Sequence, residues 1–137
     1  MRYDEKLETM CFSLLVAVAS TTLLLAASSS FAADTHKSGP FAGPKANTGY
    51  VTHSTEGGKS VLAFSDDFKT PDTPDPHWAI VDSAGTMYVL DRIPLKGDVM
   101  RRRIEVPAYV KDIKIVRIWC AFAEANLGEA SFDHPVK

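Results

Sequence analysis

Short runs of β-prone residues, separated by turn-forming residues, recur along the chain from residue 50 onwards and constrain its fold more than any other feature. Two pairs of these runs are joined by turns, one at Gly57 and Gly58 and the other at residues 82–85. Such pairs are typical of β-hairpins, and no convincing amphipathic helix is present. The pattern predicts an all-β fold, a small antiparallel β-sandwich or barrel-like single domain. The expected strands cover residues 50–53, 60–64, 77–81, 86–90, 102–106, 114–121 and 126–132.

The first part of the chain has the pattern of an export signal. No charged residue lies between Met10 and Ala33, and small residues stand at Ser30 and Ala32, the two positions that a signal peptidase inspects. The sequence therefore predicts a signal peptide over residues 1–32 and a secreted or periplasmic protein. Two alternatives stay open: an uncleaved anchor, since about twenty apolar residues can span a bilayer, and translation that begins at Met10.

The part that follows the signal is long enough for one domain. Residues 33–48 are rich in Gly, Pro and small polar residues, which predicts a flexible tether, and the domain is expected over residues 49–134. After residue 32 the chain carries 13 Lys and Arg residues against 14 Asp and Glu residues. This balance indicates neither a nucleic acid nor an anionic membrane surface as a partner.

Cys120 is the only thiol left once the signal is removed. Exported proteins usually pair their cysteines or lack them, so a single one is expected to be buried, joined to another chain, bound to a metal or chemically active. Alternation along its strand places Cys120 on the same face as Val116, Ile118 and Phe122. On such a face a thiol packs as a small hydrophobic group. Because no second cysteine remains, an internal dithiol switch is excluded.

Metal binding is a further chemical interpretation of Cys120. Thiolate and imidazole suit copper or zinc, and His77 is the imidazole that we pair with Cys120, although the sequence requires no cofactor. His53 and His134 are further imidazoles that only the fold could bring near. No Ser/His/Asp set, phosphate-binding loop or dinucleotide motif is visible. The chain is therefore expected to be an accessory protein rather than a complete catalyst.

The chain resembles a known family over residues 48–132. The block at 109–120, Tyr-Val-Lys-Asp-Ile-Lys-Ile-Val-Arg-Ile-Trp-Cys, is followed by Phe122 and by Leu-Gly-Glu-Ala at 127–130. It is similar to the C-terminal signature of the DM-thirteen domain, which occurs beside haem-binding modules in Skeletor-type animal proteins and alone in exported bacterial proteins. Segments 62–68, 74–78, 95–97 and 104–107 follow the order of that family's motifs. The chain departs from the family at Thr73, where the family has Gly.

The resemblance implies a small β-sandwich and a redox or electron-transfer role for Cys120, with a redox or cell-envelope protein as partner. A single thiol can cycle through sulfenic acid or a mixed disulfide. Reactivity needs exposure and a nearby positive charge, for which Arg117 and the arginines at 101–103 are candidates by position. The alternative is a non-catalytic extracytoplasmic binding or adhesion module in which Cys120 is a buried structural residue.

Overall fold

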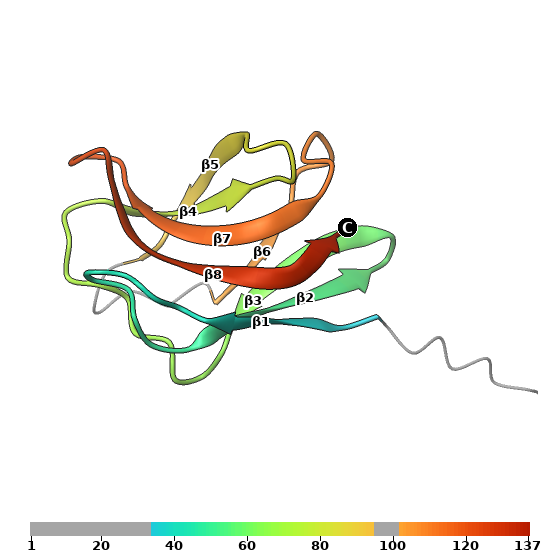
Figure 1. Ribbon diagram of the computed structural model, residues 1–137, viewed down its shortest axis with the longest axis horizontal. Coiled ribbons are helices and arrows are strands. Elements are labelled where there is room, and N and C mark those ends of the chain that lie inside the picture. Colours follow the sequence, from blue (N-terminus) through green and yellow to red (C-terminus); the bar gives the residue numbers. More distant parts are fainter. Residues whose placement is uncertain (1–33, 95–101) are drawn as a thin grey trace, which may run out of the picture. The chain divides into compact units, whose positions relative to one another are not determined.

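The computed structural model describes residues 34–94 and 102–137, and every regular element in these ranges is a β-strand. The strands form two antiparallel four-stranded sheets, in the orders β1-β2-β3-β6 and β5-β4-β7-β8, which enclose a common core (Figure 1). This arrangement confirms the predicted small all-β sandwich. The strands are β1 (His36–Pro40), β2 (Tyr50–Glu56), β3 (Lys59–Phe64), β4 (Pro76–Val81), β5 (Met87–Arg92), β6 (Arg103–Glu105), β7 (Ile113–Cys120) and β8 (Ala125–Val136).

Both predicted hairpins are present. β2 and β3 pair through the turn at Gly57 and Gly58, whose φ angles of 56° and 77° lie in the left-handed region that favours glycine. β4 and β5 pair through the turn after Asp82, whose Oδ1 accepts hydrogen bonds from the backbone N–H groups of Ala84 and Thr86. The turn chemistry visible in the sequence therefore sets the position of both hairpins.

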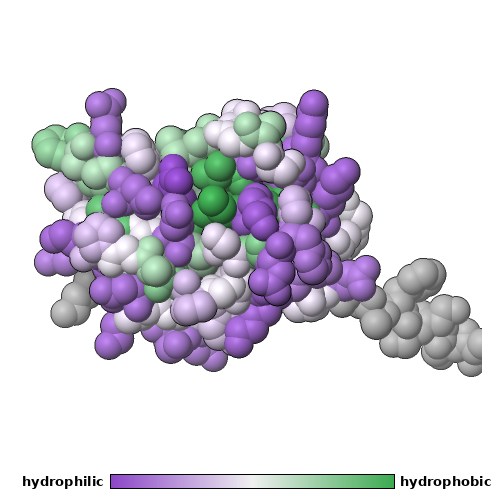
Figure 2. Space-filling model, in the orientation of Figure 1, coloured by the Kyte–Doolittle hydropathy of each residue, from purple (hydrophilic) through white to green (hydrophobic). Residues whose placement is uncertain are grey.

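The core lies between the two sheets and contains an aromatic stack. The ring of Phe64 in β3 lies 3.8 Å from that of Phe68 and 3.7 Å from that of Trp78 in β4, centroid to centroid. Large apolar side chains of this kind contribute roughly 1.5–3 kcal/mol each when they are buried. The face seen in Figure 2 is mainly hydrophilic, with a small hydrophobic group near its middle. Most of the large hydrophobic residues of the described chain are buried in one core cluster, with Val89, Tyr109 and Phe122 as exposed exceptions.

The segment expected to be a tether belongs to the folded domain. β1 pairs with β2, Phe41 is 3% exposed, and Ala46 is fully buried. The backbone of Ala42 exchanges two hydrogen bonds of 2.9 Å with that of Glu129 in β8, which links the two sheets along one side. The prediction of a flexible tether is therefore wrong for residues 36–46, and β8 continues to Val136, past the expected domain end at residue 134.

The predicted signal peptide, residues 1–32, lies outside the described residues, as do residues 95–97 of the family resemblance and Arg101. Within the described ranges, the structure contains no helix with the length and apolar character needed to cross a membrane.

Candidate functional site

Cys120 is the last residue of β7 and lies in the core. It is opposite Pro76 of β4 on one side and Ala125 of β8 on the other, and its exposure is 1%. Val116 and Ile118 are buried on the same face, as the alternation predicts. Phe122 does not continue this face, because the strand ends at Cys120 and the phenyl ring is 78% exposed in the following turn.

Three of the four arginines that were candidates to activate the thiol lie in the described part of the chain, and all three are bonded to other groups. The guanidinium of Arg117 donates to Glu129 Oε2 at 3.0 and 2.9 Å, on the face of β7 that points away from the core. Arg102 donates to the carbonyl oxygen of Ser65 at 2.8 Å, and Arg103 forms an ion pair with Glu56. These three guanidinium groups are thus engaged by Glu129, Ser65 and Glu56.

His77 and Cys120 lie on opposite faces of one sheet. Pro76 is opposite Cys120, so His77, one residue further along β4, is directed to the outer face beside Trp119. Its Nδ1–H donates to the carbonyl of Leu90 at 2.8 Å, and its Nε2 lies 3.1 Å from Asp75 Oδ1. The structure therefore does not bring together the predicted copper or zinc ligands. In residues 34–94 and 102–137, no group of three His, Cys, Asp or Glu side chains is placed to hold a metal ion.

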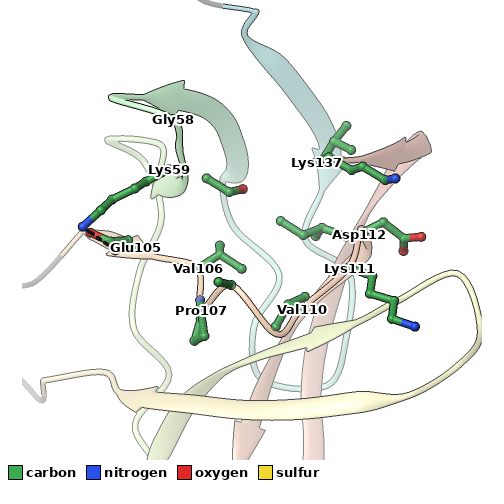
Figure 3. A pocket seen from close by; sticks show the side chains of 13 residues that line it. Gly58, Lys59, Glu105, Val106, Pro107, Val110, Lys111, Asp112 and Lys137 are labelled. Carbon is green, nitrogen blue, oxygen red and sulfur yellow. Dashed lines mark hydrogen bonds and ion pairs between the residues drawn. The ribbon is translucent and has the colours of Figure 1, made fainter.

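A cavity of about 360 Å³ lies at the end of the sandwich where the β2–β3 turn meets the β6–β7 connection and the end of β8 (Figure 3). Its apolar wall is formed by Val106, Val110, Ile113 and Val136, and Ser60 is a polar residue beside it. Sequence reasoning missed this cavity, because its lining comes from segments that are far apart in the chain. The charged residues at its edge are Lys59, Lys111 and Lys137 together with Glu105 and Asp112.

Some of the charged side chains around the cavity have a bonding partner, and others form no ion pair in the described part of the chain. Lys59 Nζ lies 2.9 Å from Glu105 Oε1, so these two charges form an ion pair. The carboxylate of Asp112 accepts hydrogen bonds from the hydroxyl and the backbone N–H of Ser83, at 2.6 and 2.7 Å, and these bonds lower the pKa of that carboxyl. In the described part of the chain, Lys111 and Lys137 form no ion pair. Figure 3 shows both of their amino groups at the edge of the cavity and directed outward.

His53 lies directly behind Ser60, and its side chain is fully buried. Its Nε2 is 2.7 Å from Ser60 Oγ, while its Nδ1 has no hydrogen-bond partner within the described residues. The ring stacks on that of His36 in β1, with 5.6 Å between centroids. Burial, and to a smaller extent the charge of His36, lowers the pKa of His53. The imidazole is therefore held neutral beside the cavity.

No protein-family model, curated protein or solved structure matches this chain. The fold defines the class to which the protein belongs, a small all-β domain of two antiparallel four-stranded sheets. Its function has to follow from the residues of this chain.

Proposed function

We propose that this protein is an exported, non-enzymatic binding module of the DM-thirteen type, in which Cys120 is a structural residue. The burial of Cys120 carries this proposal. At 1% exposure, between Pro76 and Ala125 of the neighbouring strands, the thiol is closed to a reagent or a partner protein. A cysteine that reagents and partners cannot reach is a structural residue, whereas reactive cysteines are partly exposed.

The exported, DM-thirteen part of the proposal is supported by the sequence. The uncharged stretch between Met10 and Ala33, with small residues at Ser30 and Ala32, favours export. The resemblance over residues 48–132 favours the family, and the two-sheet architecture agrees with the sandwich that the resemblance implies. The near-neutral charge after residue 32 favours a binding partner other than nucleic acid.

A redox role through Cys120 is the second candidate, and the position of the residue in β7 favours it. Cys120 ends the strand, and the turn that follows carries the exposed Phe122 and Glu124, whose φ is 50°. Opening of this turn would bring the thiol to the surface. Its thiolate would then attack one sulfur of a partner's disulfide, forming a mixed disulfide while the other sulfur leaves as a thiolate.

Thiol labelling separates the two candidates. Cys11, the cysteine of the predicted signal peptide, is replaced by serine so that Cys120 is the one thiol of the chain. In this background, we expect Cys120 of the native protein to react with a disulfide reagent only after denaturant is added. A matched protein, Cys120→Ser with Ala123→Cys, places the thiol on an exposed residue of the adjacent turn and is expected to react at once. Copper and zinc are measured on the same samples.

Rapid reaction of native Cys120 would overturn the structural role and support the redox candidate. A stoichiometric metal that blocks the reaction until a chelator is added would also overturn it, in favour of ligation. Labelling that requires denaturant, with no metal present, would support the buried structural role.

A further inference from the structure

The cavity at the end of the sandwich has a rigid apolar wall. Val106, Ile113 and Val136 belong to the buried core cluster, and Val110 packs against it. Val106 directly follows β6, Ile113 and Val136 are the first residue of β7 and the last residue of β8, and Val110 lies in the β6–β7 connection. A volume of about 360 Å³ lies in the range of small-molecule sites, which are mostly apolar with few polar groups. The cavity thus has the volume of a small-molecule site and a lining that combines apolar and charged residues.

Ser60 lines the cavity, and its hydroxyl contacts the buried imidazole of His53. A neutral imidazole carries one proton, and Nδ1 of His53 is buried without a partner in the described chain. A buried N–H without an acceptor costs more than a lone pair without a donor, so the proton belongs on Nε2. Nε2–H then donates to Ser60 Oγ over 2.7 Å. The hydroxyl hydrogen of Ser60 is left free to donate to a ligand.

The charge at the edge of the cavity favours an anion. Asp112 and Glu105 are already bonded to Ser83 and Lys59, while Lys111 and Lys137 form no ion pair in the described chain. The side chains at the edge carry three positive charges (Lys59, Lys111 and Lys137) against two negative ones (Glu105 and Asp112), which leaves an excess of one positive charge. When an anion enters, its contacts with water are replaced by contacts with the long, flexible side chains of two lysines and with the hydroxyl of Ser60.

From these observations we propose that the cavity binds a small organic carboxylate. Its apolar body lies on the wall formed by Val106, Val110, Ile113 and Val136, and its carboxylate accepts the hydrogen bond of Ser60 near Lys111 and Lys137. This inference rests on the proposed function, since it names the ligand class of the binding module. Binding at this end of the sandwich does not involve Cys120, so the two proposals fail separately.

Titration of the full, ¹⁵N-labelled chain with a panel of carboxylates, observed by NMR, tests the inference. The panel is butanoate, hexanoate, octanoate and phenylacetate, each matched with its neutral amide. We expect saturable shifts at the amides of Ser60, Val110 and Val136 with at least one carboxylate, and binding of its amide at least five times weaker. Ser60→Ala is expected to weaken carboxylate binding about tenfold, because it removes a hydrogen bond to a charged group.

Variants at exposed positions test binding in the cavity without changing the hydrophobic core. Ala108 is exposed and lines the cavity, so Ala108→Trp should obstruct it and abolish binding, whereas Ala123→Trp, in the exposed turn after β7, should not. Lys111→Gln should weaken binding about twofold, and Lys69→Gln, at an exposed lysine outside the cavity lining, should have no effect. The inference is overturned if no carboxylate shifts these amides at 10 mM, if the amides bind equally well, or if Ala108→Trp binds normally. None of these outcomes changes what is expected for the labelling of Cys120, so the two proposals are tested separately.

Discussion

The buried imidazole of His53 makes the stability of this protein depend on pH. Burial and the neighbouring His36 lower its pKa in the folded state below the ordinary value of 6.5. Between the two pKa values the unfolded chain binds more protons than the folded one, so the free energy of unfolding rises with pH in this window. The contribution of His53 to the free energy of unfolding therefore decreases as pH falls from about 6.5 to the folded-state pKa. Below that pKa the contribution is constant. Each unit between the two values corresponds to about 1.4 kcal/mol.

We expect the urea midpoint of the protein to fall between pH 7.5 and pH 5, and His53→Gln to reduce this fall. Glutamine can bond Ser60 without taking up a proton, so the variant is less stable at pH 7.5 but less sensitive to acid. His134→Gln, at an exposed histidine of β8, serves as the control and should keep the full pH dependence. An unchanged slope in His53→Gln would show that other groups cause the acid sensitivity.

Single residues on strands could be placed from the sequence wherever alternation decides the face. The rule put Cys120 with Val116 and Ile118, and all three are buried. The same rule places His53 on the face of buried Val51 in β2, so the alternation of this strand indicates the burial of the imidazole. His77 and Cys120 could not be separated in this way, because their relative faces depend on the register between β4 and β7.

At the scale of elements, the close crossing of residues 43–46 over β8 joins the two sheets. A Cβ atom on Gly128 would lie 2.0 Å from the carbonyl oxygen of Ala46, and one on Gly43 would lie 2.2 Å from Gly128 Cα. The backbone hydrogen bonds from Lys45 and Ala46 to Leu127, at 2.9 and 2.8 Å, require this approach. Glycine is needed at both positions because the two backbones leave no space for a side chain.

Gly128→Ala should therefore destabilise the protein by about 3 kcal/mol, the upper end of the usual cost of overpacking, because backbone rather than a flexible side chain has to move. Gly39→Ala is the matched control, since its Cβ would meet the nearest atom, Ser131 O, at 3.7 Å, an ordinary contact. We expect the free energy of unfolding of the control to lie within about 0.5 kcal/mol of that of the unmodified protein, so its urea midpoint should be nearly unchanged. Equal midpoints for both variants would contradict the close crossing.

The two hairpins were predictable because local turn chemistry encodes them, whereas β1 was not. Its residues, His36–Pro40, include a Gly-Pro pair and show no alternation of apolar residues. The strand exists because β2 offers it an edge and because Phe41, immediately after it, fills the core beside Phe64 and Phe68. A segment rich in Gly and Pro is a tether only if no strand elsewhere in the chain pairs with it. The sequence of the segment alone does not show whether such a strand exists.

At the scale of the whole molecule, the cavity is a product of topology. Ser60, Val110 and Val136 are distant in sequence and meet because β2–β3, the β6–β7 connection and β8 end at the same edge of the sandwich. Alternation predicts which side chains point inward, but it does not predict which strand ends converge. The fold class could thus be predicted from the sequence, while the candidate binding site required the assembled sheets.

The contribution of β1 to the whole molecule can be tested by truncation. A chain that begins at Asp34 keeps β1 and should unfold cooperatively, with the urea midpoint of the full chain. A chain that begins at Gly49, where the sequence placed the start of the domain, loses the β1–β2 pairing together with Phe41 and Ala46. Removal of a buried phenylalanine alone costs about 3–5 kcal/mol, a large part of the 5–15 kcal/mol that stabilises most domains.

We therefore expect the chain from Gly49 to lack a cooperative unfolding transition, as measured by the fluorescence of Trp78, whose ring stacks on Phe64 in the core next to Phe41. Phe41→Ala in the full chain separates the loss of packing from the loss of pairing, since it leaves β1 in place. Its transition should stay cooperative, with a midpoint below that of the chain from Asp34. If the chain from Gly49 unfolds at the same urea concentration as the chain from Asp34, residues 34–48 are a tether after all, and the two sheets are held together without β1.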